Sequence, residues 1–236
     1  MSNTWFAFKQ FTIHQERCAM KVGTDGVLLG AWTPLENVNS VLDVGTGTGL
    51  LALMLAQRSS DLTVDAIDID RAAVEQASEN AGQSPFSGRI QVLHANFNDF
   101  IPQKKYDLVI SNPPYFKNSL TPAEKARSNA RHMHSLSLEV LIERSISMLY
   151  PNGKISLILP ADQFRDLKQL AATHGFSPEQ VLEIHPVPGK PAIRTGVLLS
   201  RNHGKCITTR LVIEENGRHG YSAEYKELTN PFYLDK

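Results

Sequence analysis

The chain has 236 residues, 42% of them hydrophobic and 20% charged, with 24 Lys and Arg residues against 24 Asp and Glu residues. This is enough for one globular domain with a sizeable core, and the zero formal net charge argues neither for nor against a nucleic-acid partner. With no secretory pattern, no bilayer-length apolar run and only two distant cysteines, Cys18 and Cys206, we expect a cytoplasmic protein without disulfides or a membrane span.

Strand and helix patterns alternate along the chain. Strands are predicted over 41–44, 63–69, 90–94, 107–111, 154–159, 181–187 and 194–201, with a further one over 206–213. Helices are predicted over 25–32, 50–58, 71–81, 137–149 and 161–174. This alternation indicates a Rossmann-like α/β fold, with a mostly parallel sheet covered by helices on both faces.

An aromatic segment precedes the first predicted helix. We expect its Trp5 and Phe6 to pack in the core, and the alternative is that they close over a site. No internal repeat, low-complexity tract or linker interrupts the chain, so one domain is predicted over 1–236.

A glycine-rich loop follows the first buried strand. It contains Gly45, Gly47 and Gly49 and comes just after Asp43. A helix amino terminus offers unpaired N–H groups, and glycines let a ligand approach the backbone. The spacing is shorter than the G-x-G-x-x-G of dinucleotide-binding loops and is typical of methyltransferases. We expect Asp43 to face the ammonium of S-adenosylmethionine, directly or through water, and loop N–H groups to face its carboxylate.

The next two strands also end in side chains suited to a nucleoside. The carboxylate of Asp68 can accept hydrogen bonds from both ribose hydroxyls, with Ile69 beside it, whereas Asp70 is expected to cap the following helix. Asn96 stands where methyltransferases usually have Asp and can contact the adenine amine. Phe97 can lie on the adenine ring.

The tetrapeptide Asn112-Pro113-Pro114-Tyr115 follows the fourth core strand. An exocyclic amine on adenine is a poor nucleophile, because its lone pair is delocalised into the ring. The Asn112 side-chain oxygen and the Pro113 carbonyl can accept its two hydrogens, the prolines stiffen the loop, and Tyr115 can stack on the base. With the glycine loop, this predicts an S-adenosylmethionine-dependent N-methyltransferase that needs no metal.

Segment 21–32, KVGTDGVLLGAW, resembles the cofactor-binding segment that adenine methyltransferases place before the glycine loop. With the tetrapeptide, it makes nearly the whole chain similar to the tRNA1(Val) adenine-37 N6-methyltransferase family. The resemblance implies a class I methyltransferase fold with a seven-stranded sheet, and it places Lys21, Thr24 and Asp25 over the methionine end of the cofactor. It divides the domain into an N-terminal cofactor-lid segment (1–40), a core sheet (41–201) and a C-terminal extension (202–236).

The implied substrate is the adenine beside the anticodon of a valine tRNA. Such a base already lies in a loop, so splaying it into a pocket costs little. The sequence does not indicate an oligomeric state.

Two stretches of the chain are rich in basic residues. Residues 184–213 contain no acid and include His185, Lys190, Arg194, Arg201, His203, Lys205 and Arg210. The second stretch holds Lys117, Lys125, Arg127, Arg131, His132 and His134. Either could meet phosphates or form a solvated face. Reversing the charge of Arg194 and Lys205 is expected to weaken RNA binding without changing cofactor affinity.

Several other activities share the tetrapeptide or the scaffold. A release-factor glutamine methyltransferase usually has an amino-terminal helical domain, whereas only about 40 residues precede the first core strand here. A DNA adenine methyltransferase would carry a target-recognition insert, and a guanine N2 rRNA methyltransferase is more often duplicated. A non-catalytic RNA-binding module would have no need of Gly45, Gly47, Asp68 and Asn112 together.

Overall fold

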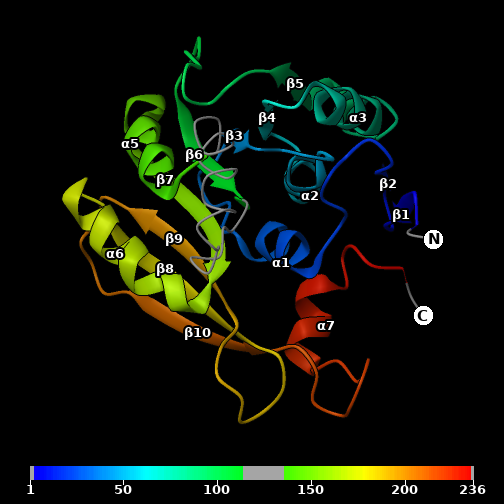
Figure 1. The fold of residues 1–236 in the computed structure, drawn as a ribbon, viewed down its shortest axis with the longest axis vertical. Helices are drawn as coiled ribbons and strands as arrows, with labels where there is room; N and C mark the ends of the chain where they lie inside the picture. Colours follow the sequence, from blue (N-terminus) through cyan, green and yellow to red (C-terminus); the bar gives the residue numbers. More distant parts are fainter. Residues whose placement is uncertain (1–2, 114–135, 235–236) are drawn as a thin grey trace, which may run out of the picture.

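The computed structural model describes residues 3–113 and 136–234. In this part of the chain, one eight-stranded sheet forms the centre of the molecule (Figure 1), with strand order β10-β8-β9-β7-β6-β3-β4-β5. The strands are β3 (Ser40–Val44), β4 (Thr63–Asp68), β5 (Ile90–His94), β6 (Tyr106–Ser111), β7 (Leu149–Pro160), β8 (Ser177–His185), β9 (Arg194–Ser200) and β10 (Ile207–Val212). All pairs are parallel except those that β9 makes with β7 and β8.

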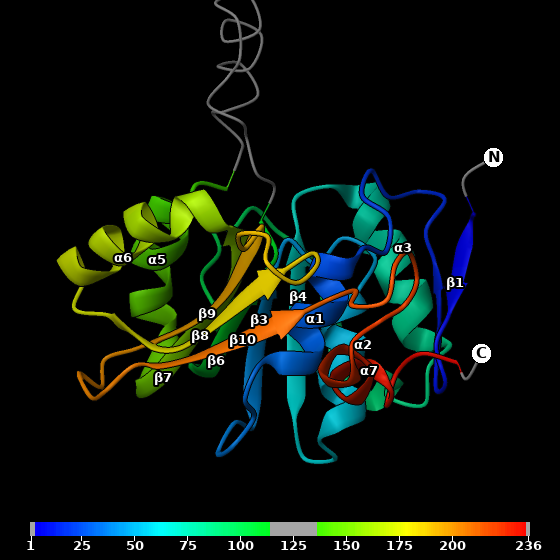
Figure 2. The same ribbon diagram turned by 90° about the horizontal axis from the view of Figure 1, so that it is seen from below.

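Helices cover both faces of this sheet (Figure 2). One face carries α1 (Thr24–Trp32), α2 (Leu50–Arg58), α3 (Arg71–Gly82) and α7 (Ala223–Thr229), and the other carries α5 (Leu138–Met148) and α6 (Phe164–Thr173). Alternate strand residues face opposite layers, so that Val41 packs with the α1–α2 core and Leu42 with the α5–α6 core. Burial on both faces explains the apolar runs of the central strands, such as 108–110 in β6 and 157–159 in β7.

The expected Rossmann-like α/β architecture is confirmed, but the strand count of seven is wrong. The strand predicted over 206–213 appears as β10 and joins the sheet edge, parallel to β8. Its Leu211 is buried in the α1–α2 core, and α7, which follows it, adds Tyr225 to the same core. The segment assigned to a C-terminal extension therefore completes one edge of the sheet and covers part of it.

A small hairpin, β1 (Trp5–Ala7) and β2 (Thr12–His14), packs outside the main sheet. Phe8 and Phe11 are buried and Phe6 packs against them, whereas Trp5 is 54% exposed, so its predicted place in the core is wrong. The Asn80 amide nitrogen donates to the carbonyls of His14 and Thr48, at 2.8 and 2.9 Å. This one side chain on α3 joins the hairpin to the glycine loop.

Helix α1 is buried almost all round, and its last turn is firmly held. The Thr33 hydroxyl lies 2.8 Å from that of Ser156 on β7, and Arg58 donates to the carbonyls of Gly30 and Thr33, at 2.8 and 2.7 Å. A β-carbon added to Gly30 would lie 2.8 Å from the Met54 sulfur and 3.1 Å from the Met54 β-carbon. Close packing of α1 on α2 therefore requires glycine at this position.

None of the helices in the described ranges is long and apolar enough to cross a membrane.

The contact at Gly30 gives a paired stability test. Gly30→Ala should destabilise the protein by about 1–3 kcal/mol, because the added methyl overpacks the α1–α2 interface. Gly82→Ala, at the exposed end of α3 where an added β-carbon meets nothing within 4 Å, should stabilise it by about 0.5–1 kcal/mol. Urea unfolding of both variants measures the difference, and equal or reversed effects would contradict the packing of α1 described above.

Candidate active site

A cavity of about 560 Å³ opens at the carboxyl ends of β3, β4, β5 and β6. Its walls come from the start of α1 with the residues before it, from the glycine loop, from the ends of β4 and β5, and from the end of β6. Carboxyl ends of parallel strands share one edge of a sheet, so residues far apart in sequence meet there. Most of the predicted site residues line this cavity: Lys21, Thr24, Asp25, Gly45, Gly47, Asp68, Ile69, Asn96, Phe97, Asn112 and Pro113.

The glycine loop is fastened to the end of β4. The Gly45 N–H donates to the Ile67 carbonyl at 2.9 Å, and the Gly47 N–H donates to Oδ2 of Asp68 at 2.9 Å. Both glycines have positive φ, 71° and 56°, and an added β-carbon would meet nothing within 4 Å. These glycines keep side chains out of the cavity. Their N–H groups bond to Ile67 and Asp68 and so anchor the loop to β4.

Gly49 and Asp43 do not line the cavity, although both were expected to contact the cofactor. Gly49 has φ 81° at the start of α2, where a β-carbon would lie 3.4 Å from that of Ala77 on α3. Asp43 is fully buried beneath the loop, and its Oδ2 accepts a 2.6 Å hydrogen bond from the Thr46 hydroxyl. Both residues support the glycine loop on the side away from the cavity.

Burial makes the carboxyl of Asp43 a weaker acid than an exposed carboxyl. Loss of solvent raises the pKa of its carboxyl to about 7, although the hydrogen bond from Thr46 opposes the rise. The carboxyl therefore titrates near neutral pH.

Asp68 lines the cavity and accepts backbone hydrogen bonds from two loops. Its Oδ2 accepts from Gly47 and its Oδ1 from the Asp70 N–H, at 2.9 Å each. Asp70 in turn accepts from the Ala72 N–H and caps α3, as predicted. Beside Asp68, the Ile69 side chain is 45% exposed, so an apolar surface lies next to the carboxylate.

The end of β5 forms another part of the wall. The side chain of Asn96 closes a turn, accepting from the Asn98 N–H at 3.0 Å and donating to Asp99 at 3.1 Å. Phe97 is only 5% exposed and belongs mainly to the α5–α6 core. Arg144 of α5 donates to the Phe97 carbonyl at 2.8 Å, a support from a distant helix that no sequence pattern indicated.

Asn112 and Pro113 lie where β6 ends and reach the same cavity. The hydroxyl of Ser111, the residue before them, donates to the Val44 carbonyl at 2.7 Å and ties β6 to β3. A β-carbon added to Gly26 of α1 would lie 3.8 Å from the Asn112 amide nitrogen. Pro114 and Tyr115 lie outside the described residues.

The segment before α1 is also fixed. The Lys21 ammonium donates to the Gln15 carbonyl, and the Val22 N–H donates to the Gln15 side chain at 2.8 Å. Asp25 forms a 2.7 Å ion pair with Arg194, the first residue of β9. Cavity residues that sequence reasoning missed include Cys18, Met20 and Leu136, which carry no recognisable motif.

Comparison with known proteins shows the family. Residues 23–176 match the model of a family described as methyltransferase small domain. A Parabacteroides distasonis protein named tRNA1(Val) (adenine(37)-N6)-methyltransferase is 46% identical to this chain, and a Bacteroides fragilis protein of the same name is 45% identical, each alignment covering 99% of both chains. The chain belongs to this methyltransferase family.

Solved structures show that the fold is the class I methyltransferase fold. A predicted O-methyltransferase from Agrobacterium tumefaciens superposes with a TM-score of 0.68, at 22% identity over 88% of this chain and 96% of its own. A methyltransferase from Thiobacillus denitrificans in complex with S-adenosylhomocysteine gives 0.52, at 16% identity over 70% and 69% of the two chains. The fold that the resemblance implied is therefore confirmed, apart from the number of strands.

The buried carboxyl of Asp43 predicts a pH dependence of stability. Its pKa is raised from 3.8 to about 7, so across this interval the folded protein keeps a proton that the unfolded chain releases. Asp43 should therefore lower stability as the pH rises from about 4 to 7, by up to about 1.4 kcal/mol per pH unit.

Asp43→Asn cannot titrate and isolates this effect. The stability of the variant relative to the unmodified protein should increase with pH over that window and level off above it, whatever its absolute value. Urea unfolding of both proteins at several pH values measures the difference, and parallel curves would show that Asp43 is ionised throughout.

Proposed function

We propose that this protein methylates the N6 amine of adenine 37 in tRNA1(Val), with S-adenosylmethionine as methyl donor. The observation that carries the proposal is that Asn112 and Pro113 open onto the same cavity as the glycine loop and Asp68, in a chain that matches its curated relatives from end to end. The chain acts as one domain in the cytoplasm, where its substrate occurs.

The residues around the cavity fit this cofactor. Its volume of about 560 Å³ is in the range of sites for small molecules. Asp68 can receive the ribose hydroxyls, and Ile69 with Phe97 offers apolar surface for the adenine ring. Asn96 lies beside that surface. Lys21, Thr24 and Asp25 also line the cavity and can face the charged methionine end of the cofactor.

When bound, S-adenosylmethionine supplies an electrophilic methyl group. Asn112 and Pro113 would orient the acceptor amine by taking its two hydrogens on the amide oxygen and the backbone carbonyl. This geometry directs the nitrogen lone pair into the cavity. Held in this way, the amine nitrogen would take the methyl group as its S–C bond breaks, and the methylated nitrogen would then release one proton to water. Positioning supplies most of the rate, so no strong base is required.

The alternative acceptors have less support. The relatives described above are named for tRNA adenine methylation, and no observation favours a glutamine acceptor or a non-catalytic RNA-binding role. Among the described residues, no group of three or more His, Cys, Asp or Glu side chains comes together to hold a metal ion. The proposed reaction uses no metal ion.

Methyl transfer tests the proposal directly. With labelled S-adenosylmethionine, the protein should label tRNA1(Val) at N6 of adenine 37, and a transcript carrying guanine at this position should stay unlabelled. Asn112→Ala should slow transfer at least about 100-fold, because an acceptor for the amine hydrogens is lost.

The same reaction with release factor and naked DNA provides the contrast. Label only in release factor would assign the protein to the glutamine methyltransferases. No label with any acceptor, or full activity of N112A on tRNA, would overturn the proposed reaction.

The basic stretch 184–213 is split between two edges of the sheet. Arg194 pairs in register with Pro160, at the edge where the cavity opens, and Ser200 lies at the other end of β9. Seven extended residues cover roughly 20 Å. Lys190 therefore lies near the cavity edge, in the β8–β9 connection, and Lys205 lies beyond the far end of β9. The second basic stretch is outside the described residues.

The β8–β9 connection holds Lys190 in a tight turn. The Lys190 N–H donates to the Val187 carbonyl at 3.3 Å, and its carbonyl lies 2.7 Å from Nδ1 of His185. Gly189 has φ 76°, as this turn requires, and the Lys190 side chain is exposed. The turn fixes the backbone from which the exposed Lys190 side chain would offer a positive charge to an RNA backbone at the cavity edge.

Because Arg194 pairs with Asp25 in the cavity wall, reversing its charge would disturb the cofactor site too, so the expectation that cofactor affinity stays unchanged is withdrawn. Lys205, at the opposite edge, is likewise no longer expected to contact the tRNA. Charge reversal at Lys190 and Lys205 tests this orientation of the tRNA. Lys190→Glu should raise the Kd for tRNA about 3- to 10-fold and reduce its salt dependence, because one phosphate contact is lost. Lys205→Glu carries the same charge change at the opposite edge and should leave the Kd unchanged. Filter binding at several salt concentrations measures both, and equal effects would show that charge acts without regard to position.

A further inference from the structure

One ion pair joins the cofactor cavity to the reversed strand of the sheet. Nε of Arg194, at the start of β9, lies 2.7 Å from Oδ2 of Asp25 in the first turn of α1. We propose that Arg194 is a positioning residue for methyl transfer, which holds this turn against the cavity through Asp25. The inference rests on the proposed function, since it concerns the same cavity.

The first turn of α1 forms one wall of the site. Gly23, Thr24, Asp25 and Gly26 all line the cavity. At Gly26 the helix also approaches Asn112, because an added β-carbon would lie 3.8 Å from the Asn112 amide nitrogen. A shift of this turn would therefore disturb the cofactor wall and the surroundings of Asn112 together.

The two ends of α1 are held by different means. Gly23 occupies the N-cap position and offers no side chain to cap the helix. Within the described part of the chain, the pair between Asp25 and Arg194 is a side-chain contact that holds the first turn. The last turn is held by Thr33, Ser156 and Arg58, as described above. Loss of the ion pair should loosen the first turn without unfolding the helix.

Partial burial makes the pair stronger than an ordinary surface contact. The side chains of Arg194 and Asp25 are only 32% and 28% exposed. Asp25 also carries its negative charge in the first turn of a helix, where the helix dipole favours it. The arginine therefore orients a carboxylate that is already well placed at the cavity wall.

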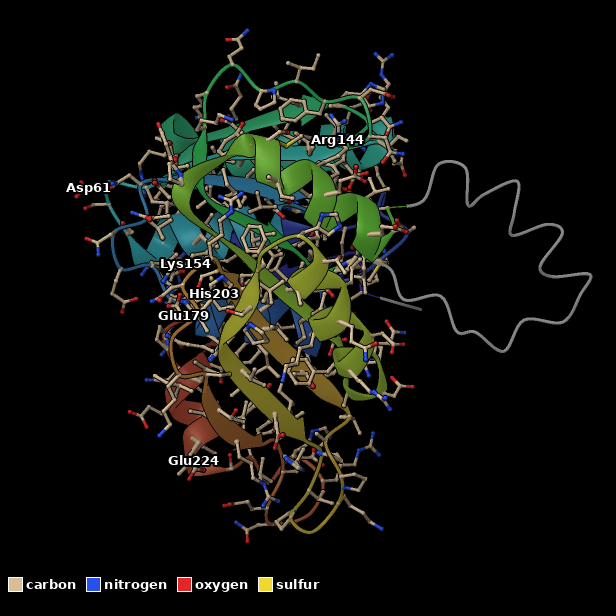
Figure 3. The ribbon with its side chains drawn as sticks, turned by 90° about the vertical axis from the view of Figure 1, so that its left-hand side faces the viewer. Asp61, Arg144, Lys154, Glu179, His203 and Glu224 are labelled. Atoms are coloured by element: carbon tan, nitrogen blue, oxygen red, sulfur yellow. The ribbon has the colours of Figure 1, made fainter. Side chains whose placement is uncertain are left out.

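The chain offers a matched control pair. Lys154 of β7 and Glu179 of β8 form an ion pair of the same length, 2.7 Å, with side chains 31% and 23% exposed. Figure 3 labels both side chains, and neither residue lines the cavity. Breaking this pair reports what loss of a half-buried ion pair does to stability alone.

The experiment compares Arg194→Gln, Arg194→Lys and Lys154→Gln. Calorimetry gives the Kd for S-adenosylhomocysteine, steady-state kinetics give kcat and KM for S-adenosylmethionine, and thermal unfolding gives Tm. R194Q should raise the Kd and the KM about 3- to 10-fold and also lower kcat. R194K should recover most of this loss. K154Q should lower Tm about as much as R194Q does, with Kd and kcat unchanged.

A double variant shows whether the effect passes through Asp25. If Arg194 acts through the carboxylate, Asp25→Asn combined with R194Q should bind S-adenosylhomocysteine no more weakly than the weaker of the two single variants. Additive losses would overturn the proposal. So would wild-type Kd and kcat in R194Q, or losses in K154Q equal to those in R194Q.

Binding of S-adenosylhomocysteine needs no methyl acceptor, so it tests the proposed function and the role of Arg194 separately. Failure of the unmodified protein to bind it would refute the proposed function. Tight binding by both the unmodified protein and R194Q would refute only the role of Arg194.

Discussion

Burial of both faces of a parallel sheet is the constraint on which the rest of this structure depends. Because each parallel connection must cross a face, the helices return the chain to the same starting edge, and the carboxyl ends of β3, β4, β5 and β6 meet at the other. That geometry brings the glycine loop, Asp68, Asn96 and Asn112 around one cavity. A single carboxylate, Asp68, then joins the glycine loop to the start of α3 by accepting the N–H groups of Gly47 and Asp70.

Local signals in the sequence predicted much of this arrangement. Asp70 was identified as a helix cap because capping depends on residues within one turn, and the strand ends were identifiable from runs of apolar residues. The burial of Asp43 was not predictable, because a carboxylate after a strand can point toward a ligand or beneath the loop. In the folded protein it turns beneath the loop and bonds to the Thr46 hydroxyl, an orientation that the motif alone does not specify.

Long-range pairing accounts for the remaining differences. Whether β10 joins the sheet depends on the exposed edge of β8, and nothing within segment 206–213 specifies that partner. The contact between Asp25 and Arg194 spans 169 residues. The basic stretch 184–213 looked like one surface in the sequence, yet strand direction sends Lys190 and Lys205 to opposite edges. The exposure of Trp5 likewise depends on how the hairpin packs.

The reversed direction of β9 has a consequence for how this scaffold can diversify. Since β8 and β9 are antiparallel neighbours, their connection is a simple hairpin and carries no helix. Residues can be inserted in or deleted from the connection at 186–193 without moving a packed layer, because surface loops of this length tolerate such changes well. Descendants of this chain could therefore acquire new acceptors by remodelling this connection, as long as Arg194, just after it, keeps its contact with Asp25 in the cavity wall.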